Sequence, residues 1–329
     1  MFKRILVPLD GSRRAEQAIP LAARIARATG STIVLMQAVW MPQGITGSLE
    51  PAIWSPELFV RDQADIAAYL ARLAASKTLK DLPTEREVAD GEPAQAILAA
   101  AQAHRADLIV MSSHGRRGLA RTFLGSVAAR VARASTAPTL IMQTGDTEDE
   151  NAWQEQRPVQ ILVALDGSAL AEAALSPAAN LSIALSAPLP GMLHLVRVLP
   201  FIETDTMTQA RKTQAIEEAM AYLDRVTRRL RGSEDAASPL QVLSLVVVDA
   251  TDIARALASE AASLEEDEEA CALIALATHG RMGWERLVTG SVTERVLAAT
   301  RAPVLVVHPP QSAHQGETRI TMTREALPR

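Results

Sequence analysis

The chain has 329 residues, of which 48% are hydrophobic and only 3% aromatic, so its cores must be built from Ala, Val, Leu and Ile. Its net charge of -5 and isoelectric point near 5.8 argue against a nucleic-acid-binding surface, which requires a basic patch. The single cysteine, Cys271, excludes an internal disulfide framework and fits a reducing compartment. Because Cys271 stands where a buried strand should begin, we interpret it as a core residue rather than a nucleophile.

The N-terminus runs directly into a charged strand pattern, which leaves no room for a signal peptide. No apolar run approaches the roughly 20 residues that a membrane helix needs. We therefore expect a cytoplasmic protein with no membrane segment.

Strand and helix patterns alternate from the first residues. Ile5–Leu9 is an aliphatic run typical of a strand buried on both faces, and Ser12 is a natural N-cap for a helix that Gly30 ends. Pro20 inside that helix predicts a kink rather than a break. Further strands are expected at Thr32–Val39, Glu85–Ala89, Leu108–Met111 and Thr139–Met142, with helices at Val60–Lys80, Pro93–His104 and Val127–Ala134.

The same plan returns in the second half of the chain. Strands are expected at Val159–Leu165, Met192–Val198, Leu240–Val248, Ala272–Ala277 and Val304–Val307, with helices at Glu203–Leu230 and Asp252–Leu264. Pro177 repeats the position of Pro20, and the acidic run 265–269 indicates a solvated loop. The alternation implies an α/β fold in which a parallel sheet is covered by helices on both faces.

Three sequence blocks occur twice in the same order. "ILVPLDGS" at Ile5 returns as "ILVALDGS" at Ile161, "HGRRGLARTFLGSV" at His114 returns as "HGRMGWERLVTGSV" at His279, and "APTLIM" returns as "APVLVV". Such a repeat indicates two homologous domains, each with its own core. We place them at residues 1–143 and 159–309, with a linker over 144–158 and a flexible tail over 310–329.

The repeated blocks fall where ligands bind in parallel sheets, beyond the carboxyl ends of the strands. Gly125-Ser126 and Gly290-Ser291 open the last helix of each half, where unpaired N–H groups and partial positive charge favour an anion. A plain helix cap is the alternative interpretation. Asp10 and Asp166 either cap a turn or contact a ligand. His114 and His279 have no second ligand at metal spacing, which favours a loop-shaping hydrogen bond over catalysis or metal binding.

On these motifs the chain resembles a tandem universal stress protein, with both domains of the family covered almost end to end. The resemblance implies Rossmann-like domains of the adenine-nucleotide α-hydrolase type, each a five-stranded parallel sheet flanked by helices. The ATP-binding branch of that family carries Gly-x2-Gly-x9-Gly-Ser/Thr, and only the first glycine differs here, being Ser112 in one half and Ala277 in the other. If that position required φ > 0, serine or alanine would be strained.

The resemblance implies ATP as cofactor, with or without Mg²⁺, bound in one or both halves. Arg116 and Arg281 would stand near the outer phosphates, although solvated arginines are the simpler interpretation. The implied nucleotide-binding residues are Asp10, Ala38, Ser112, Gly115, Gly125, Ser126 and Val127 in the first half, and Asp166, Val198, Ala277, Gly280, Gly290, Ser291 and Val292 in the second.

The main hypothesis is a nucleotide-binding regulatory or stress-response protein that is not an enzyme. A slow ATPase is an alternative, but neither half carries a P-loop lysine, an acidic metal pair or an evident water-activating base. A nucleotide-free interaction scaffold is the other alternative. The family resemblance also predicts that Thr139–Met142 and Val304–Val307 lie together, which would form an internal pseudo-dimer and cover two edge strands. Dimerisation of the whole chain is left open.

Overall fold

The fold is described from a computed structural model, which describes residues 2–40, 56–113, 124–143, 153, 157–199, 209–231, 239–248, 252–265, 270–278 and 291–309. The predicted linker, tail and glycine-loop segments fall almost entirely outside these ranges. In the described part of the chain, no helix is long and apolar enough to cross a membrane.

The first half alternates strands and helices at the positions that the sequence predicts. Ser12 caps the first helix, with its Oγ accepting a hydrogen bond from the N–H of Ala15 at 3.2 Å. The elements are β1 (Arg4–Leu9), α1 (Arg13–Glu16), α2 (Ala18–Thr29), β2 (Thr32–Val39), α3 (Pro56–Ala74), β3 (Thr84–Asp90), α4 (Pro93–Ala103), β4 (Leu108–Ser112), α5 (Ser126–Ala134) and β5 (Thr139–Met142).

The second half repeats this order. Its elements are β6 (Val159–Ala164), the short 3-10 helix η4 (Ala171–Ala174), α6 (Leu175–Ser186), β7 (Gly191–Leu199), α7 (Gln209–Arg231), β8 (Leu240–Val248), α8 (Ile253–Glu265), β9 (Cys271–Ala277), α9 (Ser291–Ala299) and β10 (Val304–Val307).

The predicted proline kink is instead an interruption. Helix α1 ends at Glu16 and α2 begins at Ala18, because Pro20 has no N–H to donate to the carbonyl of Glu16. Gln17 keeps helical dihedral angles, with φ -62° and ψ -17°, so the chain continues in nearly the same direction. In the second half the turn before Pro177 is the 3-10 helix η4.

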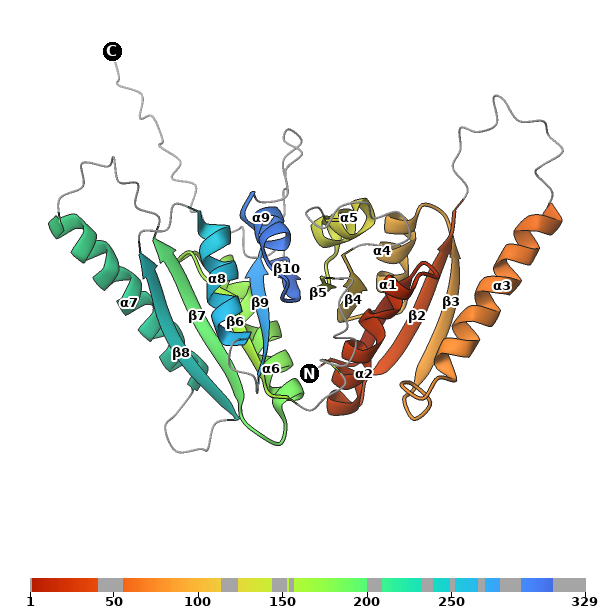
Figure 1. Ribbon diagram of the computed structural model, residues 1–329, viewed down its shortest axis with the longest axis horizontal. Helices are drawn as coiled ribbons and strands as arrows, with labels where there is room; N and C mark the ends of the chain where they lie inside the picture. The colour runs from red at the N-terminus through yellow and green to blue at the C-terminus, as the bar shows by residue number, and fades with distance from the viewer. Residues whose placement is uncertain are drawn as a thin grey trace, which may run out of the picture.

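All ten strands form one sheet, in the order β3-β2-β1-β4-β5-β10-β9-β6-β7-β8. Each half contributes five parallel strands, and the halves join where β5 pairs antiparallel with β10, with Leu140 opposite Leu305. This confirms the predicted pairing of the last strands. Figure 1 shows the result as two arms of a V that meet at β5 and β10, with α3 and α7 at the outer ends.

Each face of the sheet buries one apolar cluster that continues through both halves. The α2-side core collects buried side chains from β1, α2, η4, α6 and α7, including Ile5, Leu21 and Leu181. The α4-side core collects those from α4, α5, α8 and α9, including Leu6, Val131 and Val296. The expectation of a separate core in each half is therefore wrong, because β5 and β10 pair and α2 contacts α6.

Polar contacts also cross the junction between the halves. The guanidinium of Arg24 on α2 donates to the carbonyl of Leu185 on α6 at 2.7 Å. On the other face, Arg133 on α5 pairs with Glu294 on α9 at 3.3 Å, and the amide of Gln143 donates to the carbonyl of Leu297 at 2.6 Å. The last helix of each half is therefore tied to the other half.

Replacing Gly191 by alanine is expected to destabilise the fold. The added Cβ would stand 2.7 Å from Ser182 Oγ and 2.8 Å from the backbone N of Ile183, so α6 could not pack as closely on β7. Overpacking of this kind costs about 1–3 kcal/mol, to be measured as the change in the free energy of unfolding by urea.

Leu189→Ala is the matched control, because this side chain lies two residues away and is 57% exposed. It should change the free energy of unfolding by less than about 0.5 kcal/mol. Equal stability of Gly191→Ala and the natural protein would contradict the close approach of α6 to β7.

Candidate functional site

The candidate site of the first half lies at the carboxyl ends of β1, β2 and β4. Asp10 follows β1 directly, and Ala38 stands at the matching level of β2 because Leu9 pairs with Gln37. Leu6 pairs with Ile109, which places Ser112, the last residue of β4, at the level of Leu9. Parallel pairing thus brings residues that are far apart in sequence to one edge of the sheet.

A tight turn holds the aspartate of each half. Asp10 Oδ1 accepts hydrogen bonds from the N–H of Ser12 at 2.9 Å and from its hydroxyl at 2.6 Å, and Asp166 accepts from the N–H of Ser168 at 2.8 Å. The intervening glycines, Gly11 and Gly167, have φ of +80° and +92°, a conformation that favours glycine in this turn. The turn-capping role of the aspartates is therefore present in both halves.

The start of α5 is placed against the end of β4. The N–H of Gly125 donates to the carbonyl of Ser113 at 2.9 Å, and Gly125 is the N-cap of α5 without a side-chain cap. The first intrahelical bond is Ala129 N–H to Gly125 C=O at 2.8 Å. The N–H groups of the first turn, from Ser126 onward, have no partner within the helix, as at any helix N-terminus.

The position of the missing first glycine is free of the backbone strain considered above. Ser112 and Ala277 are the last residues of β4 and β9, and neither is among the described residues with positive φ. Serine and alanine adopt strand dihedrals without cost, so this departure from the family motif does not strain the strand end.

Apolar side chains line the same side of each site. Ala38 and Val127 in the first half are only partly buried, and both pack against the α4-side core. Val198 and Val292 do the same in the second half. Each therefore has one face in the core and another that is open to a ligand.

The remaining predicted residues, Gly115, Gly280 and Gly290, lie outside the described residues, as do His114, His279, Arg116 and Arg281. The structure thus assembles the strand-end half of each site and the start of its last helix. Among the residues it describes, no cluster of histidine, cysteine, aspartate or glutamate could hold a metal ion.

The structure adds a tyrosine cluster next to each aspartate turn, which the sequence analysis missed. The Tyr69 hydroxyl donates to Glu16 Oε1 at 2.9 Å, and the Arg72 guanidinium lies 5.5 Å from the ring centre. Burial, and then Glu16, raise the pKa of Tyr69. The signal was available, because the same three residue types recur in the second half.

The second-half cluster consists of Glu172, Tyr222 and Arg225, the last lying 5.9 Å from the ring centre. Burial and the nearby Glu172 raise the pKa of Tyr222. Among the described residues its hydroxyl has no hydrogen-bond partner of normal geometry, and Arg229 pairs with the Glu172 carboxylate.

The two sites differ in charge at one equivalent position. In the second half Arg197 lies over the Tyr222 ring at 5.4 Å, and its guanidinium carbon is 3.2 Å from where a Cβ on Gly167 would stand. The equivalent residue of the first half is Gln37, which is buried. A cation therefore borders the turn of Asp166 and is replaced by a neutral amide near Asp10.

Comparison with known proteins identifies the family. The sequence model of the universal stress protein family matches residues 1–143 and 160–308, so the chain belongs to that family and carries its domain twice. This confirms the resemblance drawn from the repeated motifs.

Individual relatives agree with this assignment. A universal stress protein of Mycobacterium tuberculosis strain H37Rv is 28% identical over 203 residues, which span 62% of each chain. The chain thus aligns with less than two thirds of that relative's length. The universal stress protein YxiE of Bacillus subtilis is 30% identical over 148 residues, which cover 44% of this chain and all of the relative.

Solved structures support the fold. A universal stress protein from Archaeoglobus fulgidus matches with a TM-score of 0.60 at 18% identity, covering 93% of this chain and 98% of that one. A protein from Pseudomonas aeruginosa, described as a putative universal stress protein, matches with a TM-score of 0.61 at 17% identity over 94% of both chains. The Rossmann-like tandem architecture is therefore shared.

The two tyrosines are expected to resist ionisation in the folded protein. The chain has only two tyrosines, and burial raises the pKa of both above the usual value of about 10. A raised folded-state pKa means that stability is intact below pH ~10 and falls as the pH rises further, because only the unfolded chain ionises there. An ultraviolet titration of tyrosinate absorbance should show no transition near the normal pKa until the protein unfolds.

Tyr69→Phe together with Tyr222→Phe is the control, since it removes both titrating groups and should flatten the loss of stability above pH ~10. A normal tyrosine titration in the native protein would contradict the buried clusters.

Proposed function

We propose that this universal stress protein binds ATP at the carboxyl edge of each half and acts as a nucleotide-dependent regulator. The observation that carries the proposal is the position of α5. Its uncapped N-terminus is held beside the end of β4 by Gly125, on the same edge as the Asp10 turn. A polyphosphate there would accept hydrogen bonds from the free N–H groups of the first turn.

The base and ribose would occupy the adjoining strand ends. Ala38 and Val127 offer apolar surface to a flat base, and the Asp10 carboxylate offers an acceptor for a hydroxyl or amino group. Mg²⁺ would bind as a complex with the ATP phosphates, because it keeps several water ligands and needs few ligands from the protein.

A regulatory role fits better than catalysis. Proton transfer in phosphoryl chemistry requires a base within hydrogen-bond reach of the nucleophile. In the described part of the site Asp10 Oδ1 accepts from both donors of Ser12, so the turn fixes this carboxylate as an acceptor that orients a ligand. We infer that bound ATP would persist and that its presence or absence would be the signal.

Placing an acidic residue in the first turn of α5 and of α9 should weaken ATP binding. Ser126→Asp combined with Ser291→Asp puts carboxylates among the N–H donors, where they repel phosphate but suit the helix dipole. Calorimetric affinity for ATP with Mg²⁺ should fall at least about tenfold, which corresponds to ~1.4 kcal/mol.

Gln95→Asp, an exposed position in the first turn of α4, is the matched control and should leave binding unchanged. No heat of binding in the natural protein would overturn the proposed function and favour the nucleotide-free scaffold. Retained binding in the double variant would place the nucleotide elsewhere on the chain.

Prolonged incubation with ATP and Mg²⁺ should leave the nucleotide intact. Chromatography of the protein-bound nucleotide should recover ATP, because neither half carries the P-loop lysine or the acidic metal pair of phosphoryl-transfer enzymes. Steady release of phosphate that disappears in Ser126→Asp/Ser291→Asp would instead show an ATPase.

A further inference from the structure

The two outermost strands of the sheet occupy equivalent places but differ in chemistry. β3, at the end of the first half, carries four charged residues, Glu85, Arg86, Glu87 and Asp90. β8, at the end of the second half, has the sequence LQVLSLVVV and carries none. Charged side chains on an outer strand are a common protection against pairing with another chain. Only the first-half edge has that protection.

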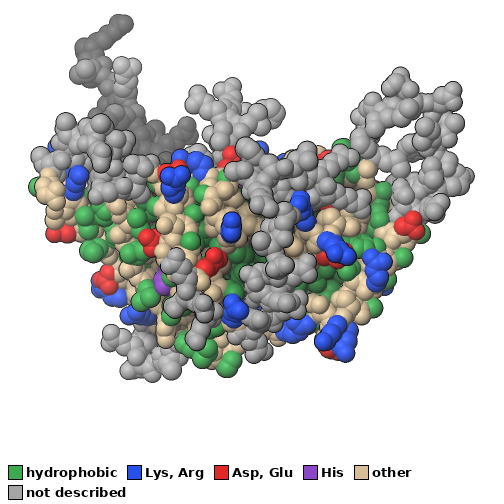
Figure 2. Space-filling view, in the orientation of Figure 1, with side chains coloured by type: hydrophobic (Ala, Val, Ile, Leu, Met, Phe, Trp, Pro, Cys, Tyr) green, Lys and Arg blue, Asp and Glu red, His purple; other side chains and the backbone are tan. Residues whose placement is uncertain are grey.

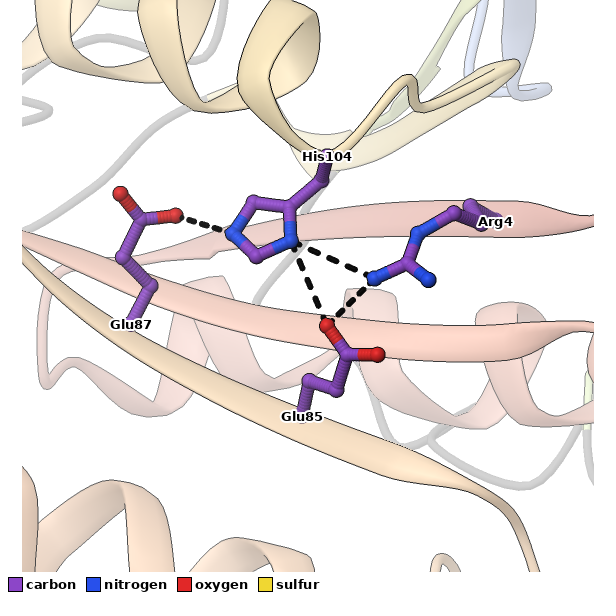
Figure 3. Close-up of polar contacts among 4 residues, drawn as sticks. All are labelled: Arg4, Glu85, Glu87 and His104. Carbon is purple, nitrogen blue, oxygen red and sulfur yellow. Dashed lines mark hydrogen bonds and ion pairs between the residues drawn. The ribbon is translucent and has the colours of Figure 1, made fainter.

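The glutamates of β3 belong to an ion network, drawn in Figure 3. Glu87 Oε2 lies 2.6 Å from His104 Nε2, and Glu85 Oε2 lies 3.3 Å from His104 Nδ1 and pairs with Arg4. His104 comes from the C-terminal end of α4, so this network joins α4 to β3 and β1. The flank of the first half is thus closed by polar side chains that satisfy one another.

The same flank of the second half is apolar and open. Leu243 and Leu245 are 53% and 41% exposed, which is unusual for leucines in the middle of a strand. Figure 2 shows hydrophobic side chains at the surface over β7 and β8. In the strand registers, counted from the repeated blocks, the equivalent pairs are Glu85 with Leu243 and Glu87 with Leu245.

In the described part of the chain, no strand pairs with the outer backbone of β8 over its second half. The N–H of Gly191 donates to the carbonyl of Pro239, so odd-numbered residues of β8 face β7 and even-numbered ones point outward. Arg231 donates to the outward carbonyl of Val242 at 2.9 Å and covers the beginning of the strand. Among the described residues no strand lies beyond β8. The open segment is therefore 244–248.

We propose that residues 244–248 pair antiparallel with the same residues of a second copy of this chain. A two-fold axis beside Val246 would place Leu245 next to Val247 of the other copy, so that these apolar side chains would cover one another. The molecule already joins equivalent edges in this way at β5 and β10, and pairing at β8 would continue the same sheet.

Pairing of β8 with the β8 of a second copy is more favourable than pairing of β8 with the β3 of that copy. Pairing β8 with the β3 edge of another copy would bring Leu245 towards Glu87, and it would leave two further edges open to form a filament. The two-fold arrangement forms a closed dimer and leaves no β8 edge for further growth. One strand edge with two leucines covers less than the roughly 800 Å² per partner of a standard interface, so the dimer should be weak and dependent on concentration.

Sedimentation velocity of the full chain over a range of concentrations tests the proposal. The natural protein should pass from monomer to dimer in the micromolar range, and Leu245→Lys should weaken association by about tenfold or more, because each copy loses a buried leucine and gains a charge. Amide hydrogen exchange of 244–248 should slow as the concentration rises in the natural protein only.

Leu189→Lys, at a 57% exposed leucine outside β8, is the matched control and should still dimerise. Circular dichroism and thermal melting check that both variants are folded. A natural protein that stays monomeric throughout, or a dimer that survives Leu245→Lys, would overturn the proposal. So would a monomer that dimerises only after removal of residues 310–329, since the chain's own end would then be the occupant.

Discussion

The antiparallel pairing of β5 with β10 is the constraint on which the rest of the molecule depends. It joins two parallel sheets by equivalent edges, so that every element of one half has a symmetry-related counterpart. The same pairing brings α5 and α9 together, where Arg133 meets Glu294, and brings α2 against α6 on the other face. The carboxyl ends of the parallel strands of both halves then lie along the upper edge in Figure 1.

Each candidate site combines an aspartate turn with a helix N-terminus, and these two features have different physical origins. The aspartate turns depend on short-range hydrogen bonds between residues two apart, which need little help from the rest of the fold. The helix N-terminus is useful only because tertiary structure carries it to the strand end, through the bond from Gly125 to Ser113. An aspartate turn of this kind could arise in many loops. The helix N-terminus at the strand end is what identifies this edge of the sheet as an anion-binding site.

Much of the fold could be predicted because its signals are local. Aliphatic runs such as Ile5–Leu9 are strands wherever they lie, and Ser12 caps a helix by contacts within four residues. The repeated motifs predicted the strand ends and the helix start that make up the candidate site, whereas nucleotide binding there stays a prediction. What failed depended on distant partners. The Tyr69–Glu16 bond exists only because α3 lies alongside α1, whereas the interruption before Pro20 is a local effect whose extent was underestimated. The exposure of Leu243 likewise depends on how much of β8 the neighbouring helix α8 leaves uncovered.

The continuity of the two cores makes the repeated halves one thermodynamic body. Cutting the chain at its midpoint would expose Leu140 and Leu305 to solvent. It would also expose the surfaces through which α2 and α6 contact each other. A severed half would expose an unpaired strand edge and an apolar helix surface to water. It would bury them again by associating with a second copy of itself or with the other half. Heating the intact chain should therefore unfold both repeats in a single cooperative step, although each is a copy of a whole domain.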